Sequence, residues 1–155
     1  ASKKPMSTIH LDALIASIRD DMAPIAEQKD IIITASASPA QIDGMEDAIR
    51  LMITNLTDNA IRYTPQGGRI ELSSSIVNGR SVVRVSDNGP GIAPDERARV
   101  FDRFYRALGT KTSGTGLGLA ITRSSILMHR GAIKAHSVMG EGTTFDVRIP
   151  LNYIV

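Results

Sequence analysis

The 155-residue chain contains no cysteine and no tryptophan, and only 4% of its residues are aromatic. Without cysteine it can form neither a disulfide framework nor a thiolate metal site, and a reducing compartment is compatible with that absence. No apolar run approaches the roughly 20 residues that a membrane-spanning helix needs. The length suits one domain with a substantial core, and we expect residues 1–7 to be a linker remnant and 8–155 to form the domain.

The formal net charge is only +2, so neither sign dominates the chain as a whole. Basic residues nevertheless concentrate in one stretch, at Arg97, Arg99, Arg103, Arg106 and Lys111. A nucleic acid could bind such a cluster, but the chain offers few aromatic side chains for stacking on bases. We therefore expect no nucleic-acid partner, and a small phosphate-bearing ligand or an ordinary solvated surface explains the cluster better.

Hydrophobic periodicity predicts an α/β (α+β) two-layer sandwich, with helices packed on one face of a mixed, largely antiparallel sheet. Apolar residues at helical spacing predict helices over 8–29 (where Pro24 should introduce a kink or a weak turn), 48–63 and 117–129. Short β-rich runs predict strands over 31–35, 69–77, 80–87, 132–138 and 143–149. Asn78-Gly79 favours a tight type I′ hairpin between the second and third of these strands.

The segment from 88 to 115 is rich in glycine, proline and charge, with only a short helical stretch near 95–102. A long segment without regular structure inside a compact domain is usually functional. We therefore expect residues 90–115 to form a lid over a binding site.

Four short motifs follow one another along the chain. Asn55 and Asn59 come first, one helical turn apart, and DNGPG at 87–91, FDRFYR at 101–106 and GTGLGL at 114–119 follow. Each motif is weak alone, because short glycine runs recur by chance. Together, in this order, they predict a nucleotide site.

This order resembles the N, G1, F and G2 boxes of the catalytic ATP-binding domain of sensor histidine kinases, over about Leu11 to Pro150. That domain belongs to the Bergerat-fold ATPases, with type II topoisomerases, ninety-kilodalton heat-shock chaperones and MutL mismatch-repair proteins. The resemblance implies the Bergerat fold, ATP and Mg²⁺ as cofactors, and transfer of the γ-phosphoryl group to a histidine on a separate dimerisation domain of the same kinase. A response regulator would act downstream.

The resemblance also implies a cytoplasmic domain of an inner-membrane sensor. It would be monomeric when isolated, because the family dimerises through helices that this chain lacks. The open alternatives are a nucleotide-gated interaction module without productive transfer, and a self-sufficient ATPase of the same fold.

Asn55 and Asn59, at i and i+4, share one face of the second predicted helix. An amide oxygen is a suitable hard ligand for Mg²⁺, which takes the rest of its shell from waters and phosphates. The resemblance assigns the metal to Asn59 and phosphate contact to Arg62 and Tyr63.

Asn55 bears on the reaction, and we place it among the catalytic residues. Hydrolysing Bergerat ATPases have a water-activating glutamate there, whereas an amide cannot accept a proton at neutral pH. The γ-phosphoryl group should then await a histidine, unless Asn55 merely orients Asn59. Two solvated asparagines are the other alternative, but Leu51 and Leu56 should place the pair on a buried face.

Asp87 ends a predicted strand and enters a glycine turn, a combination that is also common at ordinary strand ends. The resemblance makes it the acceptor for the adenine exocyclic amine. A hydrogen bond to a charged group contributes roughly 1.5–3 kcal/mol, so this carboxylate can select adenine over guanine, which presents a carbonyl there. Thr143 matches a threonine that the family places near adenine, although it could equally be structural. The resemblance also implies nucleotide contacts in the glycine turn that follows Asp87, at Gly89, Gly91 and Ile92.

The second glycine run leads directly into a predicted helix. Backbone N–H groups at a helix N-terminus make an anion site, and glycines allow close approach. No Lys-Ser/Thr follows, so it is not a P-loop, and its spacing does not fit a Rossmann fingerprint. The resemblance assigns the triphosphate to this run, with nucleotide contacts at Gly114, Thr115, Gly116, Leu117, Gly118 and Leu119.

Two arginines of the third motif, Arg103 and Arg106, are candidates for contact with the γ-phosphate, as arginines often are in phosphoryl transfer. Solvated arginines are the alternative. None of the three histidines, His10, His129 and His136, stands in the family's phosphoacceptor motif, so we expect all three to be structural or surface residues.

Overall fold

The structure is a computed structural model that describes residues 6–89, 122 and 124–151. Its helices and strands, in chain order, are β1 (Ser7–His10), α1 (Leu11–Glu27), β2 (Ile32–Ala37), β3 (Gln41–Gly44), α2 (Glu46–Tyr63), β4 (Arg69–Val77), β5 (Arg80–Asp87), β6 (Ala132–Val138) and β7 (Gly142–Pro150). Residues 124–128 are also helical. The expected lid at 90–115 and the expected helix start at 117–121 lie outside the described residues.

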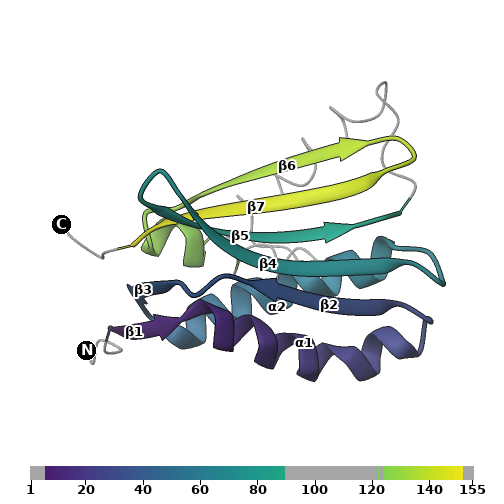
Figure 1. The fold of residues 1–155 in the computed structure, drawn as a ribbon, viewed down its shortest axis with the longest axis horizontal. Coiled ribbons are helices and arrows are strands. Elements are labelled where there is room, and N and C mark those ends of the chain that lie inside the picture. The colour runs from purple at the N-terminus through teal and green to yellow at the C-terminus, as the bar shows by residue number, and fades with distance from the viewer. Residues whose placement is uncertain (1–5, 90–121, 123, 152–155) are drawn as a thin grey trace.

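Five strands form one sheet in the order β2-β4-β5-β7-β6, and α1 and α2 pack against it (Figure 1). Only β2 and β4 run parallel, and the other neighbouring pairs are antiparallel. The predicted two-layer α/β sandwich with a mixed, largely antiparallel sheet is therefore confirmed. A separate two-stranded sheet joins β1 to β3.

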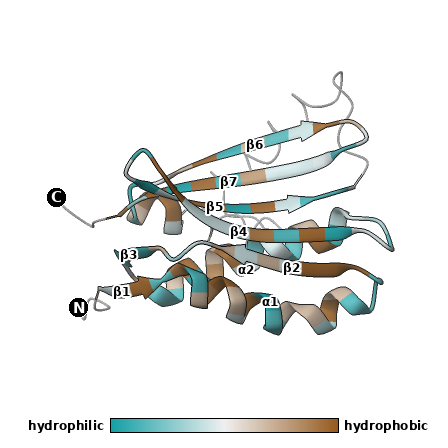
Figure 2. Cartoon of the chain, in the orientation of Figure 1, coloured by the Kyte–Doolittle hydropathy of each residue, from teal (hydrophilic) through white to brown (hydrophobic). Residues whose placement is uncertain are grey.

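The core lies between the helix layer and the sheet. α1 contributes a stripe of buried residues at helical spacing, and on β4 buried residues alternate with exposed ones over the first part of the strand (Figure 2). Burying each such aliphatic side chain contributes roughly 1.5–3 kcal/mol. The largest fully buried side chains are Ile9, Leu11, Ile15, Ile18, Ile42, Ile49, Met52, Ile53, Leu56, Ile70, Leu72 and Ile149.

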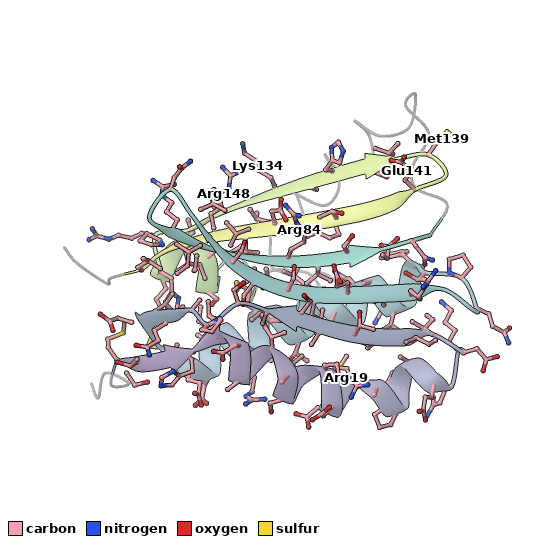
Figure 3. All side chains as sticks on the ribbon, viewed as in Figure 1. Arg19, Arg84, Lys134, Met139, Glu141 and Arg148 are labelled. Carbon is pink, nitrogen blue, oxygen red and sulfur yellow. The ribbon has the colours of Figure 1, made fainter. Side chains whose placement is uncertain are left out.

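The other face of the sheet is polar. Arg84 on β5 and Asp146 on β7 are direct cross-strand partners joined by hydrogen bonds of 2.7 and 3.1 Å. The pKa of the Arg84 guanidinium is raised by its hydrogen bond to Asp146, and then by the charge of that carboxylate. Lys134 on β6 and Arg148 on β7 are also exposed (Figure 3).

The hairpin between β4 and β5 forms where the sequence predicts it. Asn78 has φ 53° and Gly79 has φ 74°, the left-handed conformation that a type I′ turn needs at both positions. Val77 pairs with Arg80 across the turn. The predicted bounds of both strands, 69–77 and 80–87, agree with the structure.

Several boundaries differ from the sequence prediction, most of them by one or two residues. α1 begins at Leu11 rather than at residue 8, because β1 occupies the preceding residues and pairs with β3. Neither of these four-residue strands was predicted. The helix continues through Pro24 to Glu27, and β2 runs to Ala37 instead of ending at residue 35.

Candidate functional site

Asp87, the last residue of β5, is held by backbone groups from two parts of the chain. Its Oδ1 accepts a hydrogen bond from the Gly89 N–H at 2.9 Å and another from the Thr143 N–H, 56 residues away, at 3.3 Å. The residue is partly buried. Among the described residues both backbone donors bind Oδ1, and neither binds Oδ2.

Gly142 brings the turn between β6 and β7 against the end of β5. A Cβ on this residue would overlap the Asp87 carbonyl group, and its φ of 117° lies in a region that L side chains rarely adopt. Only glycine permits this approach. The close contact places Thr143, the next residue, beside the Asp87 carboxylate.

The structure thus brings together two residues that the sequence analysis selected separately, Asp87 and Thr143. The Thr143 hydroxyl lies 3.0 Å from the Ser137 hydroxyl on β6, and Ser137 is fully buried. Sequence reasoning did not select Ser137. The only feature that could have marked it is a small polar residue at a core-facing position of a strand.

Asn55 and Asn59 both lie on α2 and are partly buried. The buried stripe of this helix runs through Ile49, Met52, Ile53, Leu56, Thr57, Ala60 and Ile61. Leu51 is 42% exposed, so the expectation that it shares a buried face with the asparagines is wrong. The helix is rotated so that the two amides lie at the border between core and solvent.

The last turn of α2 carries the two residues expected to contact phosphate. Arg62 is exposed, and its guanidinium donates to the Asp58 carboxylate at 3.1 Å. Tyr63 is 71% exposed. Both side chains are therefore on the solvent side of the helix.

The remaining sequence-predicted site residues lie outside the described part of the chain. They are Gly91, Ile92, Arg103, Arg106, Gly114, Thr115, Gly116, Leu117, Gly118 and Leu119.

Within residues 6–89, 122 and 124–151, no group of three or more His, Cys, Asp or Glu side chains is arranged to hold a metal ion. In the same residues no helix is both long and apolar enough to cross a membrane.

Comparison with known proteins identifies the family. The family model described as histidine kinase-, DNA gyrase B-, and HSP90-like ATPase matches residues 44–153. Sensor histidine kinase RppB of Synechocystis is 33% identical over 146 residues, which are 91% of this chain and 32% of RppB. The phosphate regulon sensor protein PhoR of Pseudomonas aeruginosa is 37% identical over 141 residues, 88% of this chain and 32% of PhoR. The chain thus spans about a third of the length of these relatives.

Solved structures agree with this assignment. Full-length ShkA in complex with AMPPNP superposes with a TM-score of 0.79 at 31% identity, over 97% of this chain and 32% of ShkA. The nucleotide-free catalytic domain of histidine kinase ThkA superposes with a TM-score of 0.78 at 26% identity, over 96% of this chain and 97% of that domain. The chain therefore belongs to the histidine kinase-, DNA gyrase B- and HSP90-like ATPase family, as a catalytic domain of the sensor histidine kinase type.

Proposed function

We propose that this domain binds Mg²⁺–ATP and presents its γ-phosphoryl group to a histidine on a separate phosphoacceptor domain. The observation that carries the proposal is the Asp87 carboxylate, fixed by two backbone N–H groups that both bind Oδ1. The family membership and the AMPPNP-bound relative ShkA support a nucleotide at this site.

Asp87 would recognise the base. Its Oδ2 can accept a hydrogen bond from the exocyclic amine of adenine, whereas guanine would direct a carbonyl oxygen at the same acceptor. A Cβ on Gly89 would lie 3.1 Å from Asp87 Oδ1, so glycine at this position avoids crowding the carboxylate. Because Thr143 donates its N–H to Oδ1, the carboxylate is oriented before the nucleotide arrives.

The chemistry of α2 fits a metal-bound triphosphate. We assign Mg²⁺ to the amide oxygen of Asn59, since this cation takes few protein ligands and completes its shell with water and phosphate oxygens. Mg²⁺, when bound, neutralises charge on the phosphates. Arg62 and Tyr63 would contact phosphate from the last turn, together with the glycine run at 114–119.

Asn55 determines the class of reaction within this proposal. An amide cannot remove a proton from water at neutral pH, so Asn55 cannot serve as the general base of hydrolysis. Transfer would depend on positioning and charge neutralisation, in line to an incoming imidazole. Arg103 and Arg106 are the candidates for contact with the γ-phosphate.

The proposal extends to organisation and partners. Residues 1–7 would be a linker, 8–155 the catalytic domain and 90–115 its lid, and the isolated domain would be monomeric and cytoplasmic. The partners would be ATP or ADP, the phosphoacceptor dimerisation domain of the same kinase, and a response regulator downstream.

Calorimetric titration of Mg²⁺–ATP into the purified chain tests this function. We expect a saturating isotherm whose baseline returns to zero after each injection, because binding without hydrolysis releases no continuing heat. Asp87→Asn should abolish detectable binding for two reasons. The charged acceptor, which contributes roughly 1.5–3 kcal/mol, is lost. An amide that keeps its oxygen on the Gly89 and Thr143 N–H groups would also turn its NH2 group toward the adenine amine, so that two donors face each other.

Asp146→Asn is the matched control, because it removes a strand carboxylate that bonds Arg84 rather than the candidate site. Its isotherm should match that of the wild type. Retained ATP binding by a folded Asp87→Asn domain would overturn the assignment. Continuing heat flow after each injection would move the domain toward the self-sufficient ATPases.

A further inference from the structure

The C-terminal end of α2 is held by a lysine from another part of the chain. A helix leaves its last carbonyl groups without partners inside the helix. The Lys29 ammonium donates to the Ile61 carbonyl and to the Arg62 carbonyl, each at 3.0 Å. Lys29 lies between α1 and β2, more than thirty residues before the carbonyl groups that it binds.

The backbone around Lys29 is itself anchored. The Lys29 carbonyl accepts from the Gly67 N–H at 3.3 Å, and its own N–H donates to the Ala26 carbonyl at 2.9 Å. Next to it, the Asp30 carboxylate accepts from the Gln66 amide at 2.7 Å. The loop that follows α1 and the turn that follows α2 are therefore joined as one unit, and the lysine is presented from a fixed position.

The joined loop and turn also lie close to Asp87, the residue that would recognise the base. Asn88, directly after Asp87, accepts the Arg69 N–H on its side-chain oxygen at 2.6 Å. A Cβ on Gly89 would lie 3.5 Å from the Pro65 ring, in ordinary contact. The turn after α2 thus packs against the residues that directly follow Asp87.

Charge favours a lysine at this end of the helix. The carbonyl end of a helix carries a partial negative charge that attracts cations, and hydrogen bonds from an ammonium group are strengthened by its charge. The cation within the last turn, Arg62, directs its guanidinium at Asp58 instead. Lys29 is partly buried, so solvent screens its attraction to the carbonyl groups less than at an exposed position.

We propose that Lys29 is a positioning residue for the nucleotide site. By binding the carbonyl groups of residues 61 and 62, it fixes the last turn of α2, from which Asn59, Arg62 and Tyr63 would meet the metal and the phosphates. This inference rests on the proposed function. The alternative is that Lys29 stabilises the helix end without affecting ligand binding.

Three variants separate these roles. Lys29→Met removes both hydrogen bonds and keeps most of the apolar stem, and it should weaken Mg²⁺–ATP binding roughly three- to tenfold. Lys29→Arg can still donate to both carbonyl groups and should retain near wild-type affinity. Lys134→Met makes the same change on the exposed polar face of the sheet, where no effect is expected (Figure 3).

Affinity is measured by calorimetry at a temperature where circular dichroism and urea unfolding show every variant fully folded. Lys29→Gln replaces Lys29→Met if the latter unfolds there. Equal affinities of the wild type and Lys29→Met would overturn the inference, and so would an equal loss in Lys29→Arg. If the wild type itself does not bind Mg²⁺–ATP, the proposed function fails and the inference fails with it.

Discussion

Two glycines of the β6–β7 turn adopt positive φ but differ in their surroundings. Gly140, at 79°, has open space where a Cβ would stand. Gly142, at 117°, has the Asp87 carbonyl group in that place. The pair separates the effect of backbone conformation from that of steric overlap at the candidate site.

Gly140→Ala should destabilise the domain by roughly 1–2 kcal/mol, the usual penalty for an L side chain in a left-handed conformation. Gly142→Ala should destabilise it by roughly 1–3 kcal/mol more, because the new methyl group must displace the end of β5. Urea unfolding of both variants measures the difference. Equal free energies of unfolding would show that the turn yields without moving Asp87.

The site residues differ in how far the sequence alone could find them. Asp87 and Asn59 stand in short motifs, so their residue types and spacing predict a role. The contact between Asp87 and Thr143 spans 56 residues, and no local pattern encodes it. Lys29 stands in no motif, because binding carbonyl groups requires only a cation at the right place in space.

At the scale of elements, the N-terminal end of α2 is capped by a side chain 84 residues further along the chain. The N-cap residue Met45 offers no side-chain cap, and its N–H donates to His129 Nε2 at 3.0 Å. Since Nε2 accepts, the proton is on Nδ1, which donates to the Ser125 carbonyl at 2.8 Å. Ser125 in turn donates its hydroxyl to the Ala48 carbonyl at 3.0 Å.

This arrangement gives His129 the structural role that the sequence analysis allowed. The side chain is buried, at 2% exposure, and a Cβ on Gly44 would lie only 2.8 Å from its Nε2. The helical segment 124–128 is therefore attached to the first turn of α2 by side chains. α2 is held at one end by His129 and at the other by Lys29, with Asn55 and Asn59 between them.

His129→Ala should destabilise the domain by about 3 kcal/mol, because it leaves the Met45 N–H without its acceptor and opens a cavity. His136→Ala, on the exposed side of β6, should change stability by no more than about 0.5 kcal/mol. Urea unfolding compares the two. Similar effects of both substitutions would contradict the capping role.

The elements that the sequence predicted well are those whose conformation is determined by residues close together in the sequence. Asn78-Gly79 sets the hairpin and with it the register of β4 and β5. β1 and β3 were missed because four residues are too few for an alternation pattern, and their pairing is set by chain segments about 35 residues apart. The rotation of α2 was misjudged at Leu51, since a helical pattern with apolar residues on several sides does not define one buried face.

At the scale of the whole molecule, the two-layer fold has separate polar and ligand-facing regions. In the part of the chain that the structure describes, the sheet face opposite α1 and α2 carries solvated charges such as the Arg84–Asp146 pair. The candidate site lies where the end of β5 meets the β6–β7 turn and the turn after α2. In the proposed function a nucleotide base bound there would be held by this edge, and its phosphates would extend toward α2.

Phosphoryl transfer should therefore require a second protein. With radiolabelled Mg²⁺–ATP alone, the chain should incorporate no phosphate and release little, because Asn55 cannot activate water. Addition of the separately purified phosphoacceptor domain of the same kinase should place the label on that domain. The rate should fall well below that of a covalently linked kinase, since the two domains must first meet.

Two control variants test whether the label reaches the acceptor histidine and whether it comes from ATP bound at the candidate site. Replacing the acceptor histidine by glutamine should abolish labelling while ATP binding persists, and Asp87→Asn should abolish both. ATP binding without any transfer to an intact acceptor would identify a nucleotide-gated interaction module. Steady release of phosphate without the acceptor would require another group to activate water in place of Asn55, and would place the chain with the hydrolysing ATPases of its family.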